Sequence, residues 1–517
     1  MSPTLLIREP AIARFKDFDP VLLDRARRFL TFQDQGVAYQ ISKHKKNRRW
    51  QSSDPEGWSD HLEGLKSQLK RCILFEDEEG FYTYSGLVDQ LRAALLSPIA
   101  LENSTLAPEP RGMAWAGTPR VPRPYQQEAK EALLAARHGA ISCPTGAGKS
   151  FVLVQLVHDL GLKTLVIAPS QSILSQLVAD FRNAFGDRYV GQFGGGKKKF
   201  DRLITVGTFQ SLTRLEPGDP AWEELSKVEV LLCDESHLTA AATLEKVCMG
   251  LARNAPYRFF VSATQVRGDG SELVLKGVTG PIVYKKEMKE LVDQKFLAKP
   301  HFHMIRVRSD GTFESDDALK MGRKHFYYNP RIVKRAAEIA NSAVKVLGHQ
   351  VLIMVEEISQ FAHLLRHLEF NPRFAHGAAK SDPELRSKLP EQYWASDPLK
   401  LVDEFNDEGF PILVATSCCG MGTDFRTPQT VINLQGGRSP IGTPQLVGRG
   451  TRRHTFHDGR KKTSFNLIDF CPILNTRSFN DGAGEDSNHS PPYRHALARA
   501  AMYEELYPNV RWENETR

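Results

Sequence analysis

The sequence lacks the features that mark metal-binding, secreted and membrane proteins. Its seven cysteines are scattered, and none has the C-x-x-C spacing of a zinc site or a redox pair. An odd, scattered set of this kind indicates reduced core thiols in a cytosol-like compartment. No run of about 18 apolar residues occurs, so we expect no membrane span. The short apolar run before Arg8 is no signal peptide.

Neither sign of charge dominates. The 68 Lys and Arg residues against 61 Asp and Glu residues give a net charge of +7, which permits a nucleic-acid partner without requiring one. Repeats, low-complexity segments and the paired P-D…E-x-K pattern of nucleases are all missing from the sequence. A chain of 517 residues predicts about two to four domains.

Two regions alternate short, β-rich apolar runs with helical stretches, which predicts parallel sheets covered by helices on both faces. The runs are residues 139–143, 164–169, 203–208, 228–235 and 257–264, then 349–356, 411–417, 430–435 and 464–470. We therefore expect an α/β fold of two tandem domains after a small α+β domain. The expected boundaries are 1–103 (accessory domain), 104–122 (proline-rich linker or strap), 123–290, 291–480 and 481–517 (a tail with a helix).

The stretch ISCPTGAGKS has the chemistry of a phosphate-binding loop. Gly146 and Gly148 let the backbone aim its N–H groups at phosphate oxygens, and the apolar run that follows predicts a helix starting near Gly148. Lys149 would reach the β and γ phosphates, and the Ser150 hydroxyl would bind Mg²⁺. The strict pattern has a glycine where this chain has Cys143. A glycine turn at a helix start is the alternative.

The apolar run VEVLLCDESH ends in two carboxylates. At the carboxyl end of a parallel strand they would lie where such sheets bind ligands. Asp234 would hold the Mg²⁺, and Glu235 would orient and deprotonate an attacking water. Alone, such a sequence is more typical of a strand-end turn, but after a phosphate loop it favours ATP hydrolysis.

Together these motifs resemble the superfamily 2 helicases and translocases of the D-E-x-H type, over residues 123–453. That family often lacks the first glycine of the loop, which accounts for Cys143. The resemblance implies two RecA-like domains, ATP and Mg²⁺ as cofactors, and nucleic-acid-dependent ATP hydrolysis. In RPYQQEA it implies that Gln126 reads the adenine edge, with Arg123 and Tyr125 nearby. The implied ATP-binding residues are Arg123, Tyr125, Gln126, Pro144, Thr145, Gly146, Ala147, Gly148, Lys149, Ser150, Gly422 and Asp424.

Other segments resemble the family's coupling and nucleic-acid motifs: VIAPSQSILSQ, VGTFQSL, SAT and VATSCCGMGTDF. The implied coupling residues are His237, Ser262, Ala263, Thr264 and Gln445. The expected nucleic-acid-binding residues are Pro169, Ser170, Gln176, Lys197, Lys198, Thr208, Gln210, Ser211 and Thr416. Serine and threonine after a strand also cap helices, and a lysine run is equally typical of a solvated turn.

The segment QLVGRGTRR matches the family pattern Q-x-x-G-R-x-x-R. We expect Arg449 and Arg452, three residues apart, to share one helix face. As catalytic residues they would stabilise charge on the γ phosphate when the two domains close. A solvated basic helix face is the alternative.

Segments near residues 290–300 and 436–453 resemble the DNA-directed branch of the superfamily, with its UvsW-type, RadD-type and XPB-type members. SKHKKNRRW and the aromatics of EGFYTYSGL favour contact with an exposed strand or a fork, although a solvated basic face explains them nearly as well. We expect a monomeric enzyme acting on branched, forked or single-stranded DNA in recombination, repair or replication. Single-strand-binding or recombination proteins are further candidate partners.

Two other functions stay open. The chain could be the motor subunit of a restriction or phage-defence complex, which would need a partner nuclease. It could also be a non-catalytic nucleic-acid-binding scaffold with a structural nucleotide. Lys149, Glu235 and Arg449 speak against a scaffold, since a scaffold need not retain every catalytic group.

Overall fold

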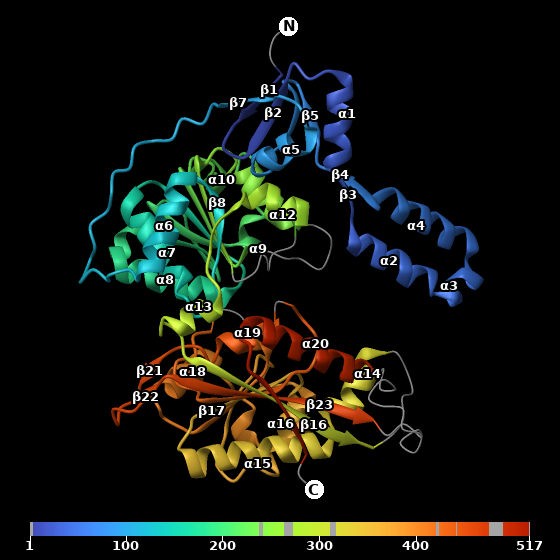
Figure 1. The fold of residues 1–517 in the computed structure, drawn as a ribbon, viewed down its shortest axis with the longest axis vertical. Helices are drawn as coiled ribbons and strands as arrows, with labels where there is room; N and C mark the ends of the chain where they lie inside the picture. Colours follow the sequence, from blue (N-terminus) through green and yellow to red (C-terminus); the bar gives the residue numbers. More distant parts are fainter. Residues whose placement is uncertain are drawn as a thin grey trace. The chain divides into compact units, whose positions relative to one another are not determined.

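The computed structural model describes residues 4–236, 241–262, 272–310, 317–419, 423–440, 442–474 and 490–515 (Figure 1). These residues form two compact units. The first is Met1–Cys143 with Gly148–Lys285, and the second is Lys286–Arg517 with Pro144–Ala147. None of the described helices has the length and apolar character needed to cross a membrane.

The first unit begins with a small α+β domain. Its sheet has the order β5-β6-β2-β1-β7, in which only β1 and β7 pair in parallel. The strands are β1 (Leu5–Arg8), β2 (Ile12–Lys16), β5 (Phe75–Asp77), β6 (Gly80–Tyr84) and β7 (Ala100–Asn103). Helices α1 (Pro20–Phe29) and α5 (Val88–Leu95) pack against each other beside it.

A helical arm, residues 34–69, projects from this domain (Figure 1). It contains α2 (Gln35–Lys45), α3 (Arg48–Ser53) and α4 (Pro55–Gln68). Its base is the antiparallel pair β3 (Thr31–Gln33) and β4 (Lys70–Cys72). These residues were expected only to be part of a small domain, and the arm was not predicted.

The rest of the first unit is an α/β domain. Its sheet has the order β11-β10-β12-β9-β13-β14-β8-β15, and every described pairing is parallel except β10 with β11. The strands are β8 (His138–Ser142), β9 (Thr164–Ala168), β10 (Val190–Gly194), β11 (Lys197–Lys199), β12 (Ile204–Thr208), β13 (Val230–Asp234), β14 (Tyr257–Ser262) and β15 (Ile282–Lys285). The helices are α6 (Pro124–Ala136), α7 (Lys149–Leu160), α8 (Gln171–Phe185), α9 (Phe209–Leu212), α10 (Pro220–Leu225), α11 (Ala241–Glu245) and α12 (Glu272–Thr279).

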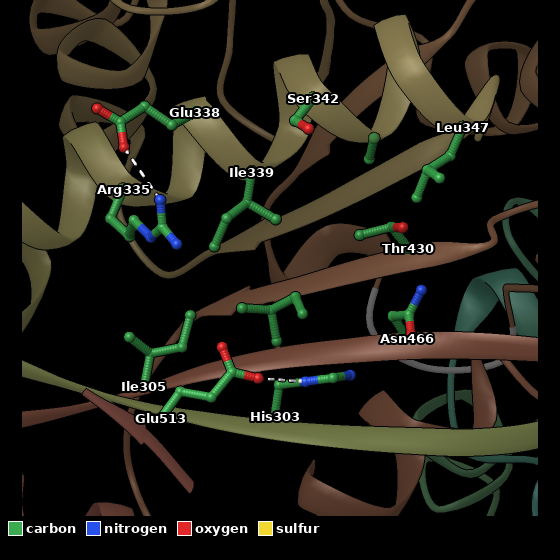
Figure 2. Close-up of a pocket in the computed structure, with 12 residues that line it drawn as sticks. His303, Ile305, Arg335, Glu338, Ile339, Ser342, Leu347, Thr430, Asn466 and Glu513 are labelled. Atoms are coloured by element: carbon green, nitrogen blue, oxygen red, sulfur yellow. Dashed lines mark hydrogen bonds and ion pairs between the residues drawn. The ribbon is translucent and has the colours of Figure 1, made fainter. Parts of the chain in front are cut away.

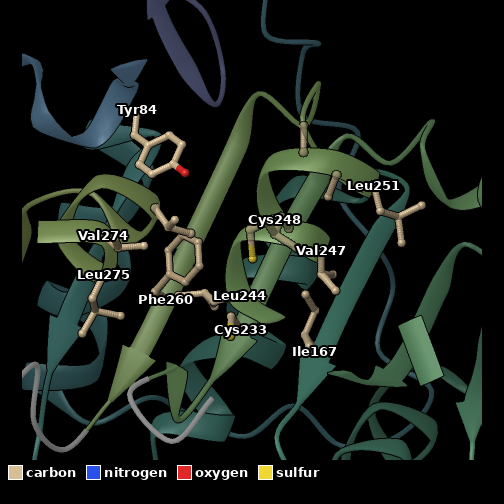
Figure 3. Packing of buried hydrophobic residues seen from close by; sticks show 14 of the residues in the cluster. Tyr84, Ile167, Cys233, Leu244, Val247, Cys248, Leu251, Phe260, Val274 and Leu275 are labelled. Atoms are coloured by element: carbon tan, nitrogen blue, oxygen red, sulfur yellow. The ribbon is translucent and has the colours of Figure 1, made fainter. Parts of the chain in front are cut away.

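One apolar cluster joins the small domain to the α/β domain (Figure 3). It includes Leu6 and Leu91 of the former together with Phe260 and Val274 of the latter. The two backbones approach closely, because a Cβ on Gly86 would lie 2.5 Å from the carbonyl oxygen of Gly277. Burial of this much shared apolar surface makes the small domain part of the first unit's core.

A buried polar network reinforces this junction. Arg71 of β4 donates to both carboxylate oxygens of Glu245, at 2.6 and 2.5 Å, and the hydroxyl of Tyr84 donates to the same carboxylate. Burial alone would lower the pKa of Arg71, but its bond to Glu245 and the charge of Glu245 outweigh burial and raise that pKa. Glu245 ends α11, so the base of the arm is fixed to the α/β domain.

The proline-rich segment after β7 is an extended strap. Backbone N–H groups of Arg111, Met113 and Ala116 donate to carbonyl groups at the ends of α7 and α8. The ring of Trp115 stacks on His158 with centroids 4.6 Å apart. These bonds satisfy backbone groups that prolines and the lack of regular structure would otherwise leave unpaired.

The second unit is another α/β domain, and its sheet is parallel throughout the described pairings, in the order β18-β19-β17-β20-β23-β16-β24. The strands are β16 (Lys299–Ser309), β17 (Val351–Val355), β18 (Arg373–Ala375), β19 (Ile412–Ala415), β20 (Thr430–Leu434), β23 (Ser464–Leu474) and β24 (Val510–Asn514). The helices are α13 (Met288–Asp293), α14 (Ala318–Gly322), α15 (Pro330–Leu347), α16 (Ile358–Leu365), α17 (Pro383–Lys388), α18 (Pro398–Asn406), α19 (Gly442–Gly448) and α20 (Pro491–Leu506).

A fully buried ion pair holds α20 on this second sheet. Arg499 donates to both carboxylate oxygens of Asp469 in β23, at 2.7 and 2.8 Å, and the Tyr503 hydroxyl donates to the same group at 2.7 Å. The expected α/β class and the helix in the tail are confirmed. The sequence analysis did not predict β10, β15, β16, β18 or β24.

We predict that Glu245→Gln destabilises the first unit by about 1–3 kcal/mol, because Arg71 and Tyr84 would lose a charged acceptor in a half-buried setting. Denaturant unfolding measures the loss. Glu223→Gln, at an exposed position of the same unit, is the matched control and should leave the midpoint unchanged. Equal midpoints for the two variants would contradict the role given to Glu245.

Candidate active site

Several of the predicted site residues that the structure describes in the first unit lie at one edge of its sheet. The strands are parallel, so their carboxyl ends meet there, and the register pairs Ser262 with Ser142 and Asp234 with Val261. The phosphate loop follows β8, while Asp234 ends β13 and Ser262 ends β14. Chain topology alone therefore brings together segments more than a hundred residues apart in the sequence.

The phosphate loop has the backbone that its glycines allow. Gly146 and Gly148 have φ values of +93° and +79°, which side chains with a Cβ rarely adopt. Helix α7 begins at Lys149, as predicted, so the first N–H groups of a 12-residue helix face the loop. This arrangement suits an anion with several oxygens, such as a triphosphate.

The segment predicted to recognise adenine begins α6 and touches the loop. Gln126 is buried, and its side-chain oxygen accepts the backbone N–H of Arg123 at 2.9 Å. A Cβ on Gly148 would lie 2.6 Å from Nε2 of Gln126, so this glycine is required for space as well as for conformation. Arg123 also donates to the Tyr125 hydroxyl at 3.1 Å.

Three charged groups converge beside the loop: Lys149 and Asp234 are buried, and Glu235 is mostly shielded from water. The ammonium group of Lys149 lies 3.1 Å from Oε1 of Glu235, and the hydroxyl of Ser150 donates to Oδ2 of Asp234 at 3.5 Å. Burial raises the pKa of Asp234 to about 7, the charge of Glu235 adds to this rise, and Lys149 opposes it. A site with more negative than positive charge in a buried space suits a cation.

Glu235 has an unusual backbone. Its φ of +46° lies in the left-handed region, which is uncommon for a residue with a Cβ. Strain of this kind costs about 1–3 kcal/mol and is concentrated at functional sites. The conformation turns the chain sharply after β13, so that consecutive residues present both carboxylates to the sheet edge.

The residues present fit a Mg²⁺ ion. Within the described part of the chain, Oδ1 of Asp234 is buried and has no hydrogen-bond partner. The same part holds no group of three or more His, Cys, Asp or Glu side chains suited to a metal. Mg²⁺ usually binds through one or two protein oxygens together with substrate phosphates, so Ser150 and Asp234 would suffice.

The predicted nucleic-acid residues of the first unit gather further along the same edge. The amide of Gln210 donates to the carbonyl of Pro169 at 3.4 Å, which links the segments after β9 and β12. Thr208 and Ser170 cap α9 and α8, the alternative role open to such residues. Ser211 accepts a hydrogen bond from Thr208 at 3.0 Å.

The lysine run forms β11, the second strand of a β-hairpin. Its turn is Gly194–Gly196, all with positive φ, and a Cβ on Gly195 would lie 2.2 Å from the Gln171 amide at the start of α8. Lys197 and Lys198 are exposed on this hairpin. Gln176 lies half-buried in α8.

In the second unit, the two arginines follow a helix instead of sharing one. Helix α19 ends at Gly448, so the predicted common helix face for Arg449 and Arg452 is wrong. Glycine favours helix termination, and at Gly450 a Cβ would lie 2.0 Å from the ring of Phe465. Gln445 lies within α19, and Thr416 follows β19 with its hydroxyl 3.2 Å from Sγ of Cys418.

These arginines have different surroundings. Arg452 donates to Asp424 at 2.8 Å and is about one-third exposed. Arg449 is buried against Met354, and burial lowers the pKa of Arg449 to about 10. Both guanidinium groups are therefore held by packing or pairing.

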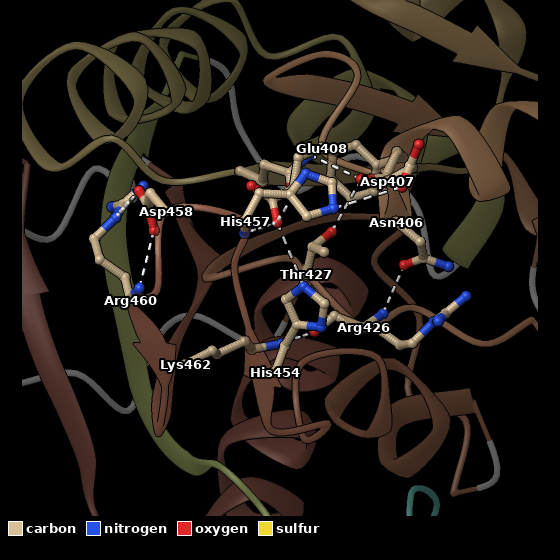
Figure 4. Close-up of polar contacts among 12 residues, drawn as sticks. Asn406, Asp407, Glu408, Arg426, Thr427, His454, His457, Asp458, Arg460 and Lys462 are labelled. Atoms are coloured by element: carbon tan, nitrogen blue, oxygen red, sulfur yellow. Dashed lines mark hydrogen bonds and ion pairs between the residues drawn. The ribbon is translucent and has the colours of Figure 1, made fainter.

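Figure 4 shows a polar framework that includes Asn406 and Arg426, and Asn406 also holds the backbone of Asp424. The Asn406 amide donates to the carbonyl of Asp424 at 2.7 Å, and Asn406 accepts the backbone N–H of Arg426 at 2.8 Å. Lys462 is buried and donates to the carbonyl of Arg426 at 3.1 Å. Glu408 accepts the backbone N–H of His457 at 2.8 Å, and this bond links the hairpin that contains His457 to the same framework.

A pocket in the second unit lies apart from these residues. It has a volume of about 330 Å³ between α15 and the sheet, and Figure 2 shows its charged groups in two internal pairs. The pairs are His303 with Glu513 and Arg335 with Glu338. None of the predicted ATP or nucleic-acid residues lines this pocket.

Four predicted residues, His237, Ala263, Thr264 and Gly422, lie outside the described residues. Sequence reasoning missed the contact of Gln126 with Gly148 and the role of Gln171 under the lysine hairpin, for which no motif gives a signal. It also left the basic residues of the arm out of its binding residues, although their charge was visible in the sequence.

Known proteins match this chain in sequence. Residues 120–267 match the family described as Type III restriction enzyme, res subunit, and residues 336–454 match the Helicase conserved C-terminal domain. The DNA 3'-5' translocase XPB2 of Sulfurisphaera tokodaii is 34% identical over 357 residues, which are 64% of this chain and 78% of that protein. The DNA 3'-5' helicase XPB of Mycobacterium tuberculosis is 28% identical over 192 residues, 36% of this chain and 34% of that protein.

Solved structures are similar to this chain to different degrees. The ATP-dependent Type ISP restriction-modification enzyme LlaBIII bound to DNA has a TM-score of 0.52 at 16% identity, covering 77% of this chain and 32% of that one. The crystal structure of T4 UvsW covers 99% of both chains at 18% identity, with a TM-score of 0.42. Identities this low speak to the fold alone.

We predict that Lys149→Ala abolishes detectable binding of a fluorescent ATP analogue, because the loop would lose its only buried ammonium group toward the β and γ phosphates among the described residues. Equilibrium titration measures this. Lys227→Ala, at an exposed position of the same unit, should bind as the wild type does. Unchanged affinity of the Lys149 variant would remove this residue from the phosphate site.

Proposed function

Since the chain belongs to the XPB-related DNA helicases and translocases of superfamily 2, we propose that it uses ATP hydrolysis to remodel branched DNA. Forks and recombination intermediates are the proposed substrates, and unwinding, branch migration or annealing the proposed outcomes. We propose that it does so as a monomer in the cytoplasm. The observation that carries the ATPase proposal is the convergence of Lys149, Asp234 and Glu235 on one sheet edge.

The residues of the first unit divide the proposed chemistry among them. Lys149 and the loop N–H groups would bind the β and γ phosphates, and Ser150 with Asp234 would hold Mg²⁺, which would supply positive charge to neutralise the phosphates. Glu235 then orients the attacking water and accepts its proton. The ammonium group of Lys149, 3.1 Å from Oε1 of Glu235, would hold the carboxylate in position for this role.

The second domain supplies the proposed coupling. Arg449 and Arg452 would stabilise charge on the γ phosphate when the domains close, with Gln445 and Ser262 relaying the nucleotide state to DNA. Asp424 supports this role because it pairs with Arg452 and is itself fixed by Asn406. Each round of closure and opening would advance the protein along one strand.

DNA contacts along the first unit's edge are proposed to be made to the backbone. Gln210 and Ser211 follow β12, and the exposed Lys197 and Lys198 lie on β11 of the same sheet, so amide, hydroxyl and ammonium groups are available for phosphate oxygens. Binding of this kind is independent of sequence and weakens as salt rises.

A second candidate is the motor subunit of a restriction or phage-defence complex. The match of residues 120–267 to the res subunit family of type III restriction enzymes favours it. Copurification with an endonuclease from the native host would support this candidate, and a chain that isolates alone with full DNA-stimulated activity would count against it.

We predict that ATP turnover rises at least about tenfold on DNA and rises most on forks and four-way junctions. Turnover is measured at one stated salt concentration with single strands, duplex, forks, junctions and RNA. Equal stimulation by single strands and junctions would contradict the branched-DNA proposal. Stimulation by RNA alone would contradict DNA as the substrate.

We predict that Glu235→Gln retains ATP binding but lowers turnover by about 10²–10⁴-fold, because an amide cannot accept the proton of water. Nucleotide titration and DNA-stimulated hydrolysis separate the two effects. Glu131→Gln, an exposed position on α6, is the control and should hydrolyse ATP normally. Normal hydrolysis by the Glu235 variant would assign the base to another residue.

A further inference from the structure

The helical arm carries one strongly charged edge. Lys43, Lys45, Lys46, Arg48 and Arg49 lie within seven positions at the end of α2 and the start of α3. The side chains of the first four are exposed, and none of those four forms an ion pair with a described residue. Residues 35–53 contain no Asp or Glu.

The opposite side of the arm has the other sign. Residues 54–68 carry Asp54, Glu56, Asp60 and Glu63 against Lys66 alone, a net charge of 1 − 4 = −3. A polyanion approaching the arm is thus attracted to α2 and α3 and repelled by α4. Charge separation of this kind gives a defined docking side, which a uniformly solvated basic face lacks.

The arm is rigid enough to present this edge. Ile41, Leu62 and Leu65 form its own small apolar core. His44 lies 2.8 Å from the carbonyl of Trp58 through Nε2, and the Trp58 indole donates to the carbonyl of His44 at 3.3 Å. These reciprocal bonds cross-link α2 and α4.

The tryptophan rings of the arm pack against a histidine of the arm itself. Trp58 stacks on His44 with centroids 5.0 Å apart, and Trp50 packs edge-on against His44 at 4.8 Å. The packing of Trp50 inside the arm disfavours a role for its ring in stacking on bases. What the arm offers instead is ammonium and guanidinium donors, which suit phosphates. The exposed Tyr39, one helical turn before Lys43, adds a hydroxyl on the same face.

We infer that the α2–α3 edge of the arm is a binding site for the phosphate backbone of duplex DNA. The inference rests on the proposed DNA-motor function and names the element that holds the duplex arm of a branched substrate. Because Arg71 and Glu245 fix the base of the arm to the ATP-binding domain, duplex held at the tip moves with that domain.

The test replaces Lys43, Lys46 and Arg48 together with Gln, which removes three charges while keeping good helix formers. The control replaces Lys334, Lys345 and Lys400 with Gln, whose side chains are 66%, 70% and 72% exposed. Anisotropy titrations without nucleotide compare a blunt 20-base-pair duplex with a thymidine 20-mer over a range of salt. Hydrolysis stimulated by the thymidine strand is measured in parallel, and thermal melting checks the fold.

The arm variant should bind duplex about tenfold or more weakly, and the slope of log affinity against log salt should fall by about 2–3. Its single-strand affinity and stimulated hydrolysis should match the control. Wild-type duplex affinity in the arm variant would overturn the inference, and equal loss on both DNAs would overturn its assignment to duplex. Absence of DNA-stimulated hydrolysis in the wild type would refute the motor function while the duplex titration still judges the arm.

Discussion

The gathering of three charged side chains, two of them buried, at the end of a parallel sheet is the constraint on which the proposed active site depends. Lys149 and Asp234 are buried and Glu235 is mostly shielded from water, with Lys149 paired to Glu235 at 3.1 Å. Burial raises the pKa of Asp234 to about 7. Such a site is costly to fold and is tolerated because strand order fixes its geometry. Glu235 adds its own strain, with a positive φ that the surrounding strands enforce.

Around this centre the first unit is built as one body. The small domain shares an apolar cluster with the α/β domain, and Glu245 joins the two through Arg71 and Tyr84. The strap adds backbone bonds to the ends of α7 and α8, the helices that follow the phosphate loop and β9. The helical arm is therefore an extension of the nucleotide-binding domain.

Much of this could be predicted because the sequence patterns were local. Apolar β-rich runs correctly predicted β8, β9, β12, β13 and β14. The glycines of the phosphate loop predicted the start of α7. The two arginines of the second domain were placed on a helix because three-residue spacing suits one. Tertiary packing prevails there, since Gly450 must approach the ring of Phe465 and the helix ends before it. The arm was missed because its helices pack on each other through few apolar residues.

The shared core also shows that the boundary of a sequence match differs from the boundary of a folded unit. Similarity to the res subunit family begins at residue 120, yet the apolar cluster beneath that domain draws on Leu6, Leu91 and other residues far upstream. The start of the sequence similarity and the limit of the shared apolar core thus divide the chain at different points. An accessory domain built in this way cannot simply be replaced by another domain. The replacement would have to match a buried apolar surface as well as a function.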